Sequence, residues 1–135
     1  MKKKGTVSEF RNDRNRELHA AFIHLLRTAD LPLAELYAAA AKSPCSRFWV
    51  GAERAATVVA RMRAGKPLGP ISETRQRMFS ELRRRIDRLQ SLHPAMSMTE
   101  ASTLAVLEPA PEFYLTPEST RVILINLRKG KEVKR

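Results

Sequence analysis

Few residues in this chain have the types and spacings that catalysis or metal binding requires. His19 and His24 lie five residues apart, so they do not share a helical face as an i, i+4 metal-binding pair does. His93 stands directly before Pro94, where a helix is expected to end, and Cys45 is the only cysteine. A single thiol excludes an intramolecular disulfide and the cysteine-rich zinc sites. We therefore expect a non-catalytic protein with no metal ion and no cofactor.

Two Gly-Lys pairs also fall short of a phosphate-binding loop. Gly65-Lys66 and Gly130-Lys131 lack both the earlier glycine and the following Ser or Thr with which such a loop holds a nucleotide and its magnesium ion. Each glycine stands where a helix is expected to end, and glycine suits the left-handed conformation found there. The pairs therefore predict helix ends.

The chain is strongly basic, which favours a polyanionic partner. It has 25 Lys and Arg against 14 Asp and Glu, for a formal net charge of +11. In the densest cluster Arg77, Arg84 and Arg88 share one helical face at about 100° per residue, opposite an apolar stripe. Such a face is typical of phosphate contacts; the alternative is a solvated face partly paired with neighbouring carboxylates. The candidate nucleic-acid-binding residues of the whole chain are Arg11, Arg14, Arg54, Arg61, Arg77, Arg84, Arg88, Arg121, Arg128 and Lys129.

Two aromatic segments suggest a second kind of contact. Phe48-Trp49-Val50 and Phe113-Tyr114-Leu115 each stand between two expected helices. In an extended segment neighbouring side chains point to opposite sides, so the first residue of each triplet packs in the core while Trp49 and Tyr114 face outward. An outward aromatic can stack on a base or dock on a partner protein. Core packing of all these aromatics is the alternative.

The chain repeats itself at an offset of 65 residues. Phe48 corresponds to Phe113, and the match continues without a gap to Gly65-Lys66 and Gly130-Lys131. A slip of one residue near Pro94 brings the first helices of the two copies into line at an offset of 64. Matches in register along a whole unit indicate a duplication.

Each copy predicts three helices, because capping residues stand before apolar residues at helical spacing. The strongest start signals are the Ser97–Glu100 capping box and the Thr116-Pro117 pair. The expected first helices begin at Ser8 and Ser72, the second span about residues 31–42 and 98–107, and the third run from Gly51 to Gly65 and from Thr116 to Gly130. The expected organisation is a basic tail at 1–7, copy one at 8–66, a linker at 67–71, copy two at 72–130 and a basic tail at 131–135.

Tandem three-helix units on a basic chain resemble helix-turn-helix proteins. That resemblance implies that the last helix of each unit enters the major groove of DNA. Two features depart from the family: the connection before the third helix is about eight residues rather than three or four, and Glu53 and Glu118 stand where a phosphate would approach. The Pro-to-Phe-aromatic-aliphatic pattern is also similar to that of small uncharacterised basic proteins, a likeness that implies no activity.

The sequence thus predicts an all-α protein built from two tandem copies of a three-helix unit, packed as one body or separately. We expect a cytoplasmic, non-catalytic nucleic-acid-binding protein, since no apolar run reaches the roughly 18 residues of a membrane span. DNA is favoured over RNA as the partner. The alternative is a protein-interaction adaptor that docks through an aromatic or apolar patch, and the two hypotheses differ in the salt dependence of binding.

Overall fold

The structure, a computed structural model, describes the backbone of residues 2–130 and the side chains of residues 10–130. Within this part of the chain the protein is all-helical, with six helices and no strand, as the composition and periodicity predicted. The helices are α1 (Lys2–Thr28), α2 (Leu33–Ala41), α3 (Ala52–Arg63), α4 (Glu73–Leu92), α5 (Met98–Val106) and α6 (Pro117–Arg128).

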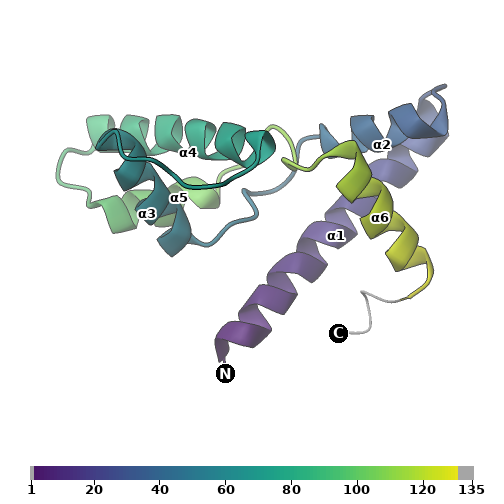
Figure 1. The fold of residues 1–135 in the computed structure, drawn as a ribbon, viewed down its shortest axis with the longest axis horizontal. Helices are drawn as coiled ribbons and strands as arrows, with labels where there is room; N and C mark the ends of the chain where they lie inside the picture. The colour runs from purple at the N-terminus through teal and green to yellow at the C-terminus, as the bar shows by residue number, and fades with distance from the viewer. Residues whose placement is uncertain (1, 131–135) are drawn as a thin grey trace. The chain divides into compact units, whose positions relative to one another are not determined.

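The helices form two compact units, and neither unit coincides with one of the two expected copies. Unit 1 combines the chain up to Cys45 with the chain from Pro111 onward, and unit 2 is Ser46–Ala110. In unit 1, α1 and α2 pack with α6; in unit 2, α3 packs with α4 and α5 (Figure 1). These boundaries differ from the expected copies at 8–66 and 72–130. The helix expected to be third in each copy lies with the helices expected to be first and second in the other: α3 with α4 and α5, and α6 with α1 and α2.

Matching hydrogen bonds accompany this exchange of third helices. In unit 2 the Phe48 N–H donates to the Val106 carbonyl at 2.9 Å, and in unit 1 the Phe113 N–H donates to the Ala41 carbonyl at 3.0 Å. One bond joins the segment before α3 to the end of α5, and the other joins the segment before α6 to the end of α2. The same kind of contact therefore occurs in both units.

Each unit has its own buried core, because every helix has apolar residues along one side. Aromatic and aliphatic side chains fill both cores, and each also contains fully buried polar residues, Asn15 and Thr120 in unit 1 and Ser102 in unit 2. The largest buried apolar side chains are Phe48, Phe79, Leu82 and Ile86 in unit 2 and Leu18, Leu36, Phe113 and Leu124 in unit 1.

The capping signals of α4, α5 and α6 and the glycine after α3 are confirmed. The Ser72 and Thr116 hydroxyls accept hydrogen bonds from backbone N–H groups in the first turns of α4 and α6, and Ser97 and Glu100 form both bonds of a capping box on α5. Gly65 ends α3 with a φ of 71°, and the Gly65 and Lys66 N–H groups turn back onto the helix carbonyls. These caps satisfy backbone groups that the helices leave unpaired at their ends.

The first helix begins earlier than the sequence analysis placed it. α1 already runs from Lys2, so Ser8 lies inside the helix and residues 2–7 are helical, not the expected tail. Extending an existing helix by a residue is far easier than starting one, and lysine is a good helix former. The tail expected at 131–135 lies outside the described residues.

Neither aromatic triplet has the extended conformation expected of it. Tyr114 has a φ of 57°, in the left-handed region that few residues other than glycine adopt. In the other triplet the Val50 N–H donates to the Phe48 carbonyl at 3.0 Å, which closes a tight turn around Trp49. The alternation of an extended strand therefore does not apply to either segment.

Candidate nucleic-acid interface

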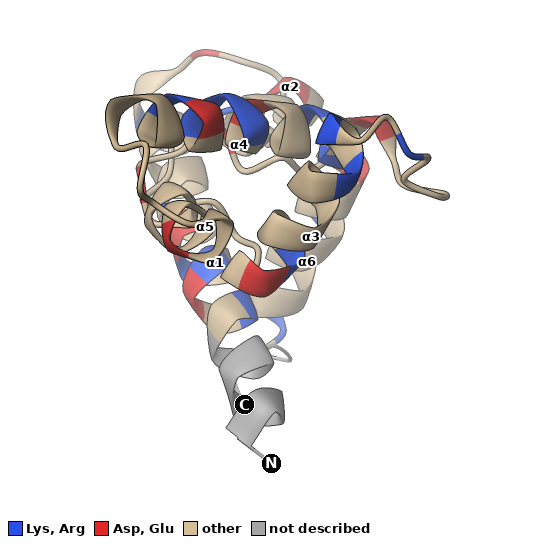
Figure 2. Ribbon diagram, turned by 90° about the vertical axis from the view of Figure 1, so that its left-hand side faces the viewer, with Lys and Arg blue, Asp and Glu red and all other residues tan. Residues whose placement is uncertain are grey.

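The six arginines of α4 have different surroundings, and four of them are exposed: Arg75, Arg77, Arg84 and Arg88. Arg77, Arg84 and Arg88 are exposed, on the side of α4 opposite its buried residues, as the spacing predicted. Figure 2 shows basic positions recurring along α4, with acidic positions between them. The Arg84 side chain is 79% exposed and approaches Glu81 only to 3.5 Å. We call Arg77, Arg84 and Arg88 the α4 stripe.

Arg85 instead belongs to the packed interior of unit 2. Its guanidinium donates to Glu81 and to Glu108 at 2.8 Å each, and lies over the Phe48 ring at 5.2 Å from the centroid. Burial alone would lower the pKa of Arg85, but the hydrogen bonds to Glu108 and Glu81 outweigh it and raise that pKa. Arg85 therefore holds α4 to the segment after α5 and is not available to a ligand.

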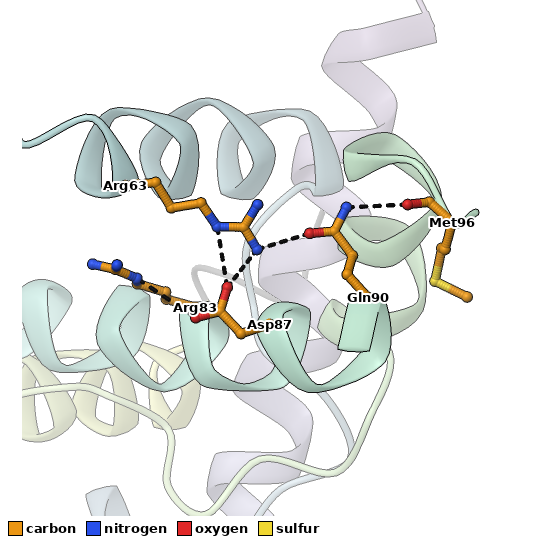
Figure 3. Close-up of polar contacts among 5 residues, drawn as sticks. All are labelled: Arg63, Arg83, Asp87, Gln90 and Met96. Carbon is orange, nitrogen blue, oxygen red and sulfur yellow. Dashed lines mark hydrogen bonds and ion pairs between the residues drawn. The ribbon is translucent and has the colours of Figure 1, made fainter. Parts of the chain in front are cut away.

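The C-terminal end of α3 is tied to α4 by a polar network (Figure 3). Arg63 pairs with Asp87, its Nε donating at 3.1 Å, and its Nη2 donates to the Gln90 side chain at 2.8 Å. Gln90 in turn donates to the Met96 carbonyl at 3.1 Å, and Arg83 approaches Asp87 at 3.7 Å. The network fixes the helix packing of unit 2.

Arg61, which the sequence analysis placed among the nucleic-acid contacts, is engaged within its own unit. Its Nε and Nη2 both donate to the Pro67 carbonyl, at 3.1 and 2.8 Å. These two hydrogen bonds hold the segment that follows α3 against the helix. Of the basic residues on α3, Arg54 best suits an anion, because its guanidinium has no hydrogen bond or ion pair within the described part of the chain.

Arg54 and Arg75 form a pair, of which only Arg54 is among the site residues predicted from the sequence. The two guanidinium carbons lie 6.0 and 5.7 Å from the centroid of the same buried ring, Phe79. Within the described part of the chain neither guanidinium has a hydrogen bond or ion pair. Burial, and then the charge of Arg54, lower the pKa of Arg75. Arg75 was not selected as a site residue; the signal for it was its position four residues before Phe79 on one helix.

The candidate residues of unit 1 are more dispersed. Arg11, Arg128 and Lys129 are exposed. Arg14 is half-buried and its Nε donates to Asn15 at 3.0 Å. Arg121 pairs with Glu118 at 2.9 Å, and this hydrogen bond lowers the pKa of the Glu118 carboxyl.

The aromatic candidates differ from what was expected. Tyr114 is buried, with 8% of its surface exposed, and its backbone is left-handed. Trp49 is half-buried, and the Arg47 guanidinium lies 5.5 Å from its ring centroid. Neither ring is presented as an open stacking platform.

Among the described residues no group of three or more His, Cys, Asp or Glu could hold a metal ion. No helix there is both long enough and apolar enough to cross a membrane. No protein-family model, curated protein or solved structure matches this chain.

Proposed function

We propose that this protein is a non-catalytic nucleic-acid-binding protein that prefers duplex DNA and contacts it mainly through unit 2. The observation that carries the proposal is the α4 stripe, three exposed arginines on the face of one helix that its core does not use. The net charge of +11 supports it, because the affinity of such proteins comes largely from contacts to phosphate.

The dimensions of the α4 stripe suit a phosphate backbone. From residue 77 to residue 88 an α-helix rises about 16 Å. Each strand of duplex DNA carries a phosphate about every 3.4 Å along the axis, so the stripe can meet several phosphates of one strand. Arginine suits this role because its planar fork of donors matches two oxygens of one phosphate.

Arg54 and Arg75 offer a second anchor in the same unit. Two positive charges lie over one aromatic ring, and within the described part of the chain neither has an ion pair. Burial, and then the repulsion between the two charges, lower the pKa of Arg75. A phosphate bound between the guanidinium groups would relieve that repulsion and accept hydrogen bonds from both. Arg54 and Arg75 also lie in the first turns of α3 and α4, where the helix dipoles favour an anion.

We also infer that the chain is a duplicated three-helix unit. The lengths of the helices support this, since α2 and α5 each have nine residues and α3 and α6 each have twelve. The second and third helices of the copies begin 65 residues apart. Two basic units on one chain would let a single molecule engage neighbouring segments of duplex.

The test is a fluorescence-anisotropy titration of the full chain with labelled duplex DNA, single-stranded DNA and RNA at two salt concentrations. We expect tightest binding to the duplex, with an affinity that falls steeply as salt rises. Replacing Arg77, Arg84 and Arg88 by Gln should reduce the slope of log affinity against log salt by about 2.7, because each lost phosphate contact removes about 0.9.

A variant that loses the same charge elsewhere is the control. Arg27, Lys42 and Lys66 are all exposed and lie outside the candidate set, so their triple replacement by Gln should change the slope much less. Equal effects of the two triple variants would mean that only net charge matters. Absence of binding at low salt would overturn the proposal.

A protein-interaction adaptor is the second candidate, and a different surface favours it. A shallow hollow of about 640 Å³ lies where α4 connects to α5, lined by His93, Met96 and Leu104 among others. Leu92, Leu104 and Leu107 are roughly half exposed or more. An adaptor of this kind would bind its partner with little dependence on salt.

A further inference from the structure

Unit 1 contains an apolar hollow lined by no residue of the α4 stripe or the Arg54–Arg75 pair. Of the nucleic-acid candidates only Arg128 lines it. The hollow has a volume of about 340 Å³, at the small end of the range for ligand pockets, and lies between α1, α2 and α6. Phe22 and Tyr37 form one wall, their rings stacked with centroids 5.4 Å apart and planes 9° apart. The aliphatic lining residues are Ile23, Leu26, Leu33, Leu124 and Ile125.

The rim of this hollow is cationic. His19 and Arg128 line both the apolar hollow and an adjoining one of about 360 Å³, to which Arg16 and Leu127 also contribute. Among the described residues no carboxylate lines either hollow. Arg16 is already paired with Asp13. Within the described part of the chain Arg128 has no such pairing, so its charge is the one left to meet a ligand.

In unit 2 the arginine that corresponds to Arg128 has two hydrogen-bond acceptors. Arg128 corresponds to Arg63 at the offset of 65. Arg63 donates to Asp87 and Gln90, which accept its hydrogen bonds within the unit (Figure 3).

In the first helices of the two copies, Asp87 and Gln90 correspond at the offset of 64 to Ile23 and Leu26. Unit 1 has therefore kept the arginine, while both of its acceptors are replaced by apolar residues that line the hollow.

We propose that the hollow of unit 1 binds a small monocarboxylate with an apolar body. The carboxylate meets the Arg128 guanidinium beside His19, in the role that Asp87 has for Arg63, and the apolar body lies against the aliphatic lining. The ligand needs a carboxylate because the planar guanidinium of Arg128 can bind one through two hydrogen bonds. An apolar body is needed because burial in the hollow supplies the rest of the affinity. This inference does not depend on nucleic-acid binding.

The test is a methyl NMR titration of the full chain with sodium octanoate, and with 1-octanol as the neutral probe of matched length. We expect saturable shifts at Leu26, Leu33, Leu124 and Ile125, with Leu104 of unit 2 unmoved and octanol bound more weakly. The proposal is overturned if octanoate gives no saturable shifts, if the shifts are spread over both units, or if octanol binds equally well.

Substitutions at the rim separate a carboxylate site from a merely apolar one. Arg128→Gln should weaken octanoate binding at least about tenfold, or about 1.4 kcal/mol, and leave octanol binding unchanged. Arg27→Gln is the control, because Arg27 is exposed on the same helix as His19 but lines neither hollow. Unchanged octanoate binding in Arg128→Gln would refute the role of the charge.

Ile23→Asp is a second variant that tests the comparison between the units. It gives Arg128 an internal carboxylate at the position of Asp87, so octanoate binding should be lost while the helical circular dichroism is retained. Retained octanoate binding in this variant would contradict the proposal. Binding of duplex DNA is measured separately by anisotropy, so failure of either proposal can be distinguished from failure of the other.

Discussion

Arg84 and Arg85 are neighbours in the sequence, but their side chains lie in different surroundings. Arg85 is 21% exposed and bonded to two carboxylates, whereas Arg84 is 79% exposed. We expect Arg85→Lys to lower the free energy of unfolding by about 1–2 kcal/mol, because lysine keeps the charge but loses the fork of donors and the stacking on Phe48. Urea unfolding followed by circular dichroism measures this.

The control for Arg85→Lys is Arg84→Lys, one residue away on the same helix. An exposed ion pair contributes little, so the control should change stability by less than about 0.5 kcal/mol. Equal losses in both variants would show that the bonds of Arg85 to Glu81 and Glu108 contribute nothing beyond a surface pair.

The hydroxyl of Ser102 is a second feature at this scale. Ser102 is fully buried on α5, and its Oγ has no hydrogen-bond partner in the described part of the chain. We expect Ser102→Ala to raise the free energy of unfolding by about 1 kcal/mol or more, because it removes a buried unsatisfied group. Thr103→Ala, at an exposed position, controls for the helix propensity of alanine and should give a smaller gain. A destabilised Ser102→Ala protein would mean that the hydroxyl is bonded in solution.

At the scale of single elements, α5 depends on its cap. It has only nine residues, too few to be stable by propensity alone, and its first turn is closed by the reciprocal bonds of Ser97 and Glu100 at 3.0 Å. Ser97→Ala should lower the free energy of unfolding by about 1 kcal/mol. Ser97→Asp, which keeps an acceptor at the cap, should recover most of this loss. If both substitutions have the same effect, the capping box is not what stabilises the helix start.

Helix boundaries could be predicted where the signal is local. The caps at Ser72, Ser97 and Thr116 are hydrogen bonds over three residues, so their residue types and spacing determine them. The start of α1 could not be placed, because an interior serine looks the same in sequence as a capping one. The left-handed Tyr114 could not be foreseen either, since tertiary packing imposes it against the preference of the residue.

The candidate sites also divide into those that a local sequence pattern predicts and those that depend on tertiary packing. The α4 stripe follows from the period of one helix and was predicted. The Arg54–Arg75 pair requires α3 to pack beside α4, and the hollow with Arg128 at its rim requires α6 to pack beside α1 and α2. Both depend on which helices share a unit, and no local pattern contains that information.

At the scale of the whole molecule, the proposed duplication accounts for why the sequence does not show which of α3 and α6 belongs to which unit. Phe48 and Phe113 are the same residue at corresponding positions, and both are buried. Val59 and Leu124, also at corresponding positions, are buried aliphatics of similar size. Either third helix therefore offers a similar apolar face to either pair of first and second helices. The pattern of hydrophobic residues therefore does not report the pairing. The bonds of Arg63 to Asp87 and Gln90 favour α3 beside α4, because the corresponding residues of α1 are apolar.

The exchange predicts how fragments of the chain should fold. Residues 46–110 contain α3, α4 and α5, the whole of unit 2, so this fragment should be helical and unfold cooperatively in urea. Residues 1–66 contain the complete first copy of the repeat but lack α6, so this fragment should show little cooperative unfolding by circular dichroism. Cooperative unfolding of monomeric 1–66 would instead mean that α3 can replace α6 in unit 1.

Mixing complementary fragments tests the exchange itself. Residues 1–66 supply α1, α2 and α3, and residues 67–135 supply α4, α5 and α6, so each fragment has the third helix that the other needs. We expect the equimolar mixture to gain helical signal beyond the sum of its parts and to elute as a one-to-one complex. The pairing is intermolecular in this case, so the gain should increase with concentration. Two fragments that fold independently and do not associate would show that each copy can close on its own third helix.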